Sequence, residues 1–117
     1  QLPAFIIGWL ADYPDPHNFV FTYFHSKGVY GTTQGQAFLD FARENLDSLV
    51  EKAIAEVDNE ARQKIYEEIQ TIAYENALGI TLYQPKEIYP MRDWVKGWMF
   101  NPMRSGEVNW EGIYKEE

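Results

Sequence analysis

The sequence predicts an α/β fold in which a strand is followed by a pair of helices, two short strands and an irregular tail. Three observations support this. Residues 4–10 form a continuous apolar run, residues 46–76 carry apolar side chains at helical spacing, and short apolar runs follow Gly79. The 117 residues correspond to one compact domain with a core of its own.

Residues 4–10 (AFIIGWL) are almost entirely apolar, which is typical of a strand that is buried on both faces. The run ends in residues 12–16 (DYPDP), where two prolines remove backbone donors and restrict the residues before them. The aromatic-rich residues 18–24 predict either a short helix or an irregular packed segment. The glycine-rich residues 26–35 predict a loop.

Two helices are predicted next. Residues 46–57 and residues 60–76 each place apolar side chains three and four positions apart, on one helical face. Asp47 is suited to the first turn of the first helix, because a carboxylate is favourable at the positive end of the helix dipole. Gly79 follows the second helix, as glycine often follows a helix end.

The last third of the chain predicts two short strands, residues 80–84 and 87–91, and then a tail without a regular period. The tail contains Trp94, Trp98 and Trp110. We expect it to pack against a body that it does not form itself. In isolation it would expose an apolar patch that favours self-association.

The charge balance disfavours two classes of partner. With 10 basic and 18 acidic side chains the net charge is −8, which opposes binding to nucleic acid and to anionic membranes. No apolar run reaches the roughly 18 residues needed to cross a bilayer. Because the sequence opens with Gln1 and Leu2, without a signal peptide, we expect it to be a piece of a longer protein.

The sequence contains no motif for a metal, a cofactor or a catalytic group. The two histidines, His17 and His25, lack metal-ligand spacing, and Asp12 and Asp15 are not part of a calcium loop. There is no cysteine, no nucleophile elbow and no phosphate-binding loop. We therefore predict no enzyme activity, no catalytic residue, no cofactor and no metal site.

The segment around Gly8 is the remaining candidate for binding. A glycine inside an apolar strand leaves the backbone accessible to a second chain, Trp9 offers a ring for stacking, and Asp12 offers a charge. The alternative is a core tryptophan and an aspartate that caps a proline turn, and the residues alone favour this alternative. The 16% aromatic content leaves the same choice between a filled core and a ligand surface.

Five segments in order resemble one protein family. They are residues 9–16 (WLADYPDP), 46–53 (LDSLVEKA), 58–70 (DNEARQKIYEEIQ), 80–83 (ITLY) and 95–98 (VKGW). Together they are similar to the C-terminal part of the extracytoplasmic solute-binding proteins of ABC transporters, in the oligopeptide/dipeptide/nickel-binding family. Each segment is weakly specific, but their order and spacing together are specific.

The resemblance implies a C-terminal fragment of a two-lobed periplasmic-binding-protein fold. Residues 1–78 would belong to the second lobe, and residues 79–117 would cross the hinge and return to the first lobe. The protein containing it would lie in the periplasm or at the cell surface, capture a solute and deliver it to an ABC permease, so that contact with the membrane is indirect.

The resemblance also implies the ligand-binding residues, which are Gly8, Trp9, Leu10, Asp12 and Tyr13. Asp12 would pair with the α-amino group of an oligopeptide, and the backbone of Gly8 and Leu10 would pair with the peptide main chain. Family members are several times longer, so the chain would supply one wall of the cleft.

Two alternatives stay open at this stage. Some members of the family bind oligosaccharides, for which stacking on Trp9 would replace the charge anchor and Asp12 would accept hydrogen bonds from sugar hydroxyls. A reading of a different class is a stand-alone helical interaction module, whose two predicted helices would dock to a partner.

Overall fold

The computed structural model describes residues 5–102 and 108–116. It divides into a helical unit, residues 5–11 and 15–80, and a second unit, residues 12–14 together with the described residues after 80. Most of the regular structure is helical, and the strands described are limited to one short pair. The expectation of an α/β fold is therefore corrected to a mainly helical chain with a two-stranded sheet.

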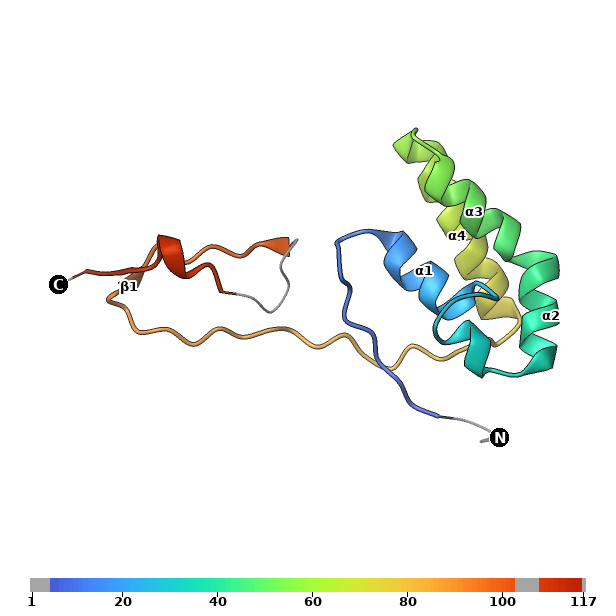
Figure 1. The fold of residues 1–117 in the computed structure, drawn as a ribbon, viewed down its shortest axis with the longest axis horizontal. Helices are drawn as coiled ribbons and strands as arrows, with labels where there is room; N and C mark the ends of the chain where they lie inside the picture. Colours follow the sequence, from blue (N-terminus) through green and yellow to red (C-terminus); the bar gives the residue numbers. More distant parts are fainter. Residues whose placement is uncertain (1–4, 103–107, 117) are drawn as a thin grey trace. The chain divides into compact units, whose positions relative to one another are not determined.

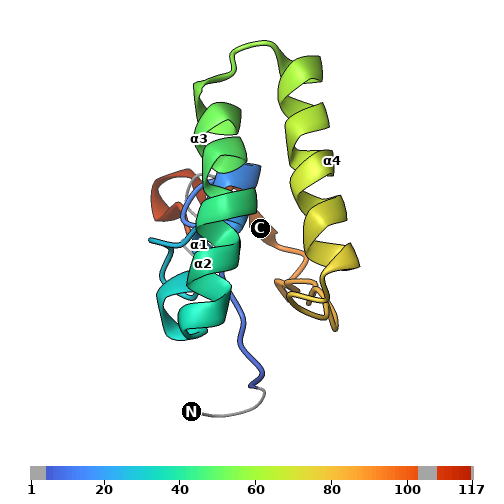
Figure 2. The ribbon, with the colours of Figure 1, turned by 90° about the vertical axis from the view of Figure 1, so that its right-hand side faces the viewer.

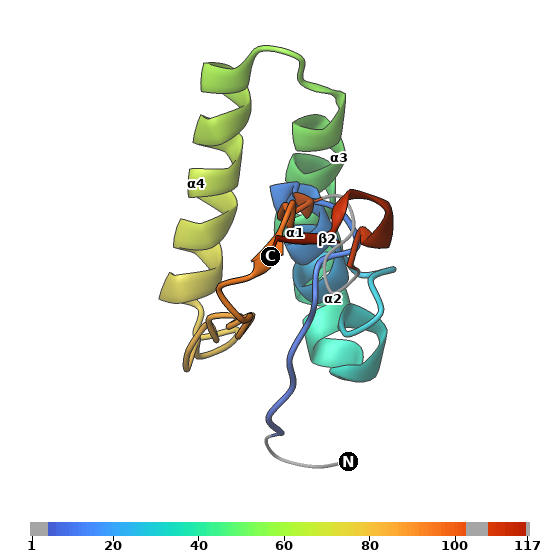
Figure 3. The same ribbon diagram turned by 90° about the vertical axis from the view of Figure 1, so that its left-hand side faces the viewer.

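Four α-helices make up the helical unit (Figure 1). They are α1 (Pro16–Phe24), α2 (Gln36–Asn45), α3 (Asp47–Ala55) and α4 (Asn59–Glu75), with a 3-10 turn η1 (Gly31–Thr33) before α2. The predicted helix pair is confirmed as α3 and α4, which lie side by side in antiparallel directions (Figures 2 and 3). Helix α2 was not predicted, and α1 confirms the helical one of the two readings of residues 18–24.

Helix α3 is central, since it packs against each of the other three helices. The core consists of apolar side chains from all four helices and from the α2–α3 junction: Val20, Phe38, Ala42, Leu46, Val50, Ala53, Ile65, Tyr66 and Ile69. Leu46, which separates α2 from α3, is completely buried. The apolar stripes that predicted α3 and α4 supply part of this core, together with residues of α1 and α2, whereas Ile54 and Val57 of the first stripe are exposed.

The loop between α1 and α2 approaches the end of α1 closely. A Cβ atom on Gly28 would lie 2.0 Å from the carbonyl oxygen of Phe21, and one on Gly31 would lie 2.1 Å from that of His25. Glycine is required at both positions, because any side chain would displace the backbone that it meets.

The predicted strands are not found. Residues 5–11 belong to the helical unit but form no strand hydrogen bonds with another described segment. Ala4, the first residue of the predicted strand, lies outside the described residues. Residues 80–84 and 87–91 form no ladder either. A strand needs a neighbouring strand for its hydrogen bonds, and the described part of the chain provides none for these segments.

The second unit contains β1 (Val95–Lys96) and β2 (Tyr114–Lys115), which pair antiparallel with Val95 opposite Lys115. A short 3-10 turn, η3 (Trp110–Gly112), precedes β2. None of the described residues of this unit is buried, and the ring of Trp110 is 76% exposed. Apart from β1, η3 and β2, the described tail residues form no α-helix or strand, as expected for an irregular tail. Of the tail residues, 103–107 and Glu117 lie outside the described part.

Candidate functional site

Trp9 is held in place by α1 and by the loop that follows it. Its indole Nε1 donates a hydrogen bond of 2.5 Å to Oδ1 of Asn18, a buried residue of α1. Its ring meets the ring of Tyr30 edge-on, with centroids 5.7 Å apart. The side chain is half-buried, so part of the indole is open to solvent while its orientation is fixed.

Gly8 combines one satisfied backbone group with open space. Its carbonyl oxygen accepts a hydrogen bond of 3.0 Å from the Tyr30 hydroxyl. A Cβ atom at Gly8 would meet no heavy atom within 4 Å. Leu10, two residues on, is 65% exposed. The backbone of this segment is thus anchored on one side and accessible to another chain at Gly8.

Asp12 and Tyr13 are both exposed and lie in a bend of the chain. They belong to the second unit, whereas Gly8, Trp9 and Leu10 belong to the helical unit. Of the five residues implied by the resemblance, the structure therefore brings together the first three. It describes Asp12 and Tyr13 within a different unit.

Asp15 has a role that the sequence analysis did not give it. It is the N-cap of α1: its carboxylate accepts a hydrogen bond of 2.8 Å from the amide of His17, and Pro16 occupies the first helical turn. An aspartate followed by a proline is a signal for a helix start, and this signal was available in residues 12–16.

Arg62 of α4 is the second residue that the sequence analysis did not select. Its Nη2 lies 2.7 Å from Oδ1 of Asp15, and its Nε donates to the carbonyl oxygen of Ala53 at 2.9 Å. The hydrogen bond from Arg62 lowers the pKa of the Asp15 carboxyl below its ordinary value, against the opposing effect of burial. Asp15 and Arg62 lie 47 positions apart, and no local pattern links them.

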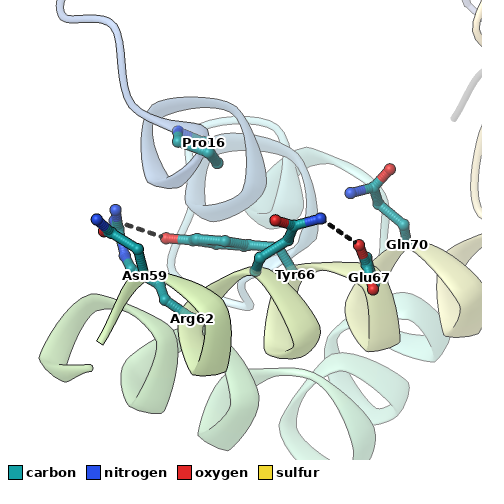
Figure 4. A pocket seen from close by; sticks show the side chains of 7 residues that line it. Pro16, Asn59, Arg62, Tyr66, Glu67 and Gln70 are labelled. Atoms are coloured by element: carbon teal, nitrogen blue, oxygen red, sulfur yellow. Dashed lines mark hydrogen bonds between the residues drawn. The ribbon is translucent and has the colours of Figure 1, made fainter. Parts of the chain in front are cut away.

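Figure 4 shows a pocket of about 470 Å³ on this side of the helical unit. The Tyr66 ring forms its floor along α4, the Arg62 guanidinium hydrogen-bonds to the Tyr66 hydroxyl at 3.0 Å, and Pro16 of α1 lies above. The other lining residues are polar: Asn59, Gln63, Glu67 and Gln70. The Arg62 and Glu67 side chains are already bonded to neighbours within the helical unit.

A cluster of polar side chains lies at the C-terminal end of α1. The carboxylate of Asp47, at the start of α3, accepts hydrogen bonds from the Ser26 amide at 2.8 Å and from the Ser26 hydroxyl at 2.5 Å. The imidazole of His25 is buried, and its Nδ1 accepts from the Lys27 amide at 3.0 Å. These bonds join the α1 end to α3. Asp47 lies in the first turn of α3, as predicted, but its carboxylate makes no cap bond to that helix and binds Ser26 instead.

The described residues hold no group of three or more histidine, cysteine, aspartate or glutamate side chains that could bind a metal ion. Within the same residues, no helix is long and apolar enough to cross a membrane. The helical unit thus presents an anchored indole beside an accessible stretch of backbone, which is suited to binding an extended ligand.

Comparison with known proteins finds similarity to periplasmic and other binding proteins. The chain is 32% identical over 81% of its length to a probable D,D-dipeptide-binding periplasmic protein of Escherichia coli. It is 25% identical over 92% of its length to a dipeptide-binding protein of the same organism. It is 28% identical over 87% of its length to heme-binding protein A of Haemophilus influenzae.

The chain spans only 18 to 19% of the length of these relatives. No family model matches it. No solved structure matches it significantly. The similarity therefore covers most of this chain and a small segment of each relative, and the relatives are named as binding proteins.

Proposed function

We propose that this chain, which belongs to the family of periplasmic peptide-binding proteins of ABC transport, supplies one wall of the cleft in which a longer protein captures an oligopeptide. The observation that carries the proposal is the similarity over 81 to 92% of the chain to proteins named for dipeptide binding. The chain has no catalytic step to perform. Its task is to bind a solute for delivery to a permease.

The geometry supports main-chain recognition. The space beside Gly8 lets a second backbone approach, and the bond from Tyr30 to the Gly8 carbonyl keeps this stretch in place. The half-buried Trp9 ring offers an apolar face next to it. Contacts of this kind hold any peptide sequence, because the groups that they use are common to all peptides.

In this proposal Asp12 provides the charge anchor. A carboxylate that pairs with the α-amino group of a peptide forms a charge-assisted hydrogen bond, which contributes roughly 1.5 to 3 kcal/mol. Tyr13 would contact the ligand beside it. Residues 1–78 would belong to the second lobe and residues 79–117 to the hinge and the first lobe. The protein would act in the periplasm or at the cell surface.

The ligand class is the part of the proposal to test first. The full-length protein that contains this chain should be titrated calorimetrically with trialanine and, in parallel, with a trisaccharide. Binding of trialanine alone supports the proposal, and binding of the trisaccharide alone favours the oligosaccharide alternative. A heme titration covers the ligand named for the Haemophilus relative.

Two substitutions test how the ligand is held. Asp12→Ala should weaken trialanine binding about 10- to 100-fold, because a charge-assisted contact is lost. Gly8→Val should also weaken binding but leave folding intact, since nothing lies within 4 Å of the added Cβ. Gly79→Val is the matched control, with equally open surroundings. If neither Asp12→Ala nor Gly8→Val changes the affinity for trialanine, the proposed site is contradicted.

A further inference from the structure

Arg62 joins three elements of the helical unit through one side chain. Its guanidinium forms an ion pair with Asp15, the N-cap of α1, at 2.7 Å. It donates to the carbonyl of Ala53 in the last turn of α3 at 2.9 Å. It also donates to the hydroxyl of Tyr66, one turn further along α4, at 3.0 Å.

Each of these partners needs a donor or a charge. The Ala53 carbonyl is among the last four of α3, which have no donor within their own helix. Asp15 already accepts from the His17 amide and gains a counter-charge from Arg62. The planar guanidinium serves all three acceptors in one conformation, which a lysine ammonium on a flexible stem does less well.

The ion pair is partly shielded from solvent. The side chains of Arg62 and Asp15 are 22% and 29% exposed. The guanidinium also lies 5.2 Å from the centroid of the buried Tyr66 ring. The pair of Arg43 and Asp40 is more exposed, with side chains 56% and 63% exposed, so solvent screens it more strongly than the pair of Arg62 and Asp15.

Asp15 is also the residue at which residues 12–14 (DYP) rejoin the helical unit. On the other side of these three residues, the chain is held through Trp9, which is bonded to Asn18. The connection that carries Asp12 therefore starts and ends at points fixed within the helical unit. Pro14 further restricts its backbone.

We infer that Arg62 is a positioning residue for Asp12: by holding Asp15 against α3 and α4, it fixes one end of the three-residue connection that carries the ligand anchor. The inference rests on the proposed function, because it assigns to Arg62 an effect on ligand binding that is exerted through Asp12. Arg62 itself makes no contact with the ligand in this scheme.

The test is a double-mutant cycle in the full-length protein, with trialanine as the probe and calorimetry as the measurement. The variants are Arg62→Gln, Asp12→Asn and the two combined, measured at a temperature where circular dichroism shows each to be folded. Arg43→Gln, which breaks the exposed ion pair on α2, is the matched control. Arg62→Lys tests whether a positive charge without the planar guanidinium is sufficient to maintain the affinity.

Arg62→Gln is expected to weaken binding about 3- to 10-fold in the wild-type background and to have no further effect when Asp12 is already Asn. Arg62→Lys should recover part of the affinity, and Arg43→Gln should leave it unchanged. An equal loss in both backgrounds would mean that Arg62 acts only on general stability, and would overturn the inference. So would unchanged affinity in Arg62→Gln when Asp12→Asn does weaken binding.

The failure of the proposed function has a different signature. If Asp12→Asn alone leaves the affinity for trialanine unchanged, Asp12 is not the anchor, and the inference is refuted together with it. If Arg62→Gln does not fold, Asp15→Asn replaces it in the cycle. Asparagine remains a good N-cap, so this variant removes the ion pair while preserving the start of α1.

Discussion

The helical unit and the second unit differ in how much of their surface they bury. Leu46, Val50, Ala53 and Ile69 of the helical unit are completely buried. The second unit has no buried residue among those described, and its contacts are a short strand pair and ring contacts such as that of Tyr89 with Trp98, at 4.9 Å. The first unit thus has a buried apolar core that stabilises its fold, and the described residues of the second unit have none.

The largest test of this contrast removes a core side chain. Leu46→Ala should lower the free energy of unfolding by about 3 to 4 kcal/mol, because it leaves a cavity between α2 and α3. The matched control is Leu82→Ala in the second unit, where the side chain is 61% exposed and a change within about 0.5 kcal/mol is expected. Thermal unfolding followed by circular dichroism measures both, and equal effects would contradict the contrast.

A second test uses the close approach of the loop to α1. Gly28→Ala places a Cβ atom 2.0 Å from the Phe21 carbonyl oxygen, so it should cost about 1 to 3 kcal/mol. Gly79→Ala adds the same atom in open space and should be close to neutral. Chemical denaturation of both variants gives the difference. A neutral Gly28→Ala would show that this loop is not packed as described.

A third test sharpens the role of the Asp15–Arg62 pair in the helical unit. The folded-state pKa of Asp15 is lowered, mainly by the hydrogen bond from Arg62. The stabilisation that the Asp15 carboxylate gives the folded state is therefore complete above its unfolded-state pKa of about 3.8. It is lost as the pH falls through the lower folded-state pKa. Asp15→Asn should lower the free energy of unfolding by about 1 kcal/mol at pH 7.

The same variant should also lose part of the acid dependence below pH 4, which a pH series of denaturation curves detects. Arg43→Gln, which breaks an exposed pair, should change neither quantity measurably. An Asp15→Asn protein whose acid dependence equals that of the wild type would contradict the ion pair.

The smallest expected effect concerns His17 on α1. Burial lowers the pKa of His17 below its ordinary value of 6.5, while the charge of Asp15 raises it in part. At a pH between the folded-state and unfolded-state pKa of His17, the unfolded state binds more protons than the folded state. The free energy of unfolding should therefore decrease as the pH falls below about 6.5. NMR titration of the ring protons should give a pKa below 6.5, and Asp15→Asn should lower it further. A pKa at or above 6.5 would contradict the burial of this ring.

Helices α3 and α4 were predictable because their signal is local. The apolar spacing that predicted them is also the spacing that buries Val50, Ala53, Ile65 and Ile69. Helix α2 follows a glycine-rich loop, and its N-cap is Gly35, which has a positive φ of 98° and no side chain to form a cap bond. The sequence therefore has no N-cap signal for this helix. The start of α1 does have a local signal, since Asp15 and Pro16 stand at its N-cap and first helical position.

The sequence by itself determined the helix pair, the prominence of residues 8–12 and the resemblance to peptide-binding proteins. The first two depend on neighbouring residues and the third on the order of segments along the chain, and none of them requires a tertiary contact. Only the tertiary structure decided that residues 5–11 have no strand partner in the described part of the chain, and that Arg62 holds Asp15. Strand pairing and the contact of Asp15 with Arg62 both depend on groups distant in sequence, which meet only when the helices pack.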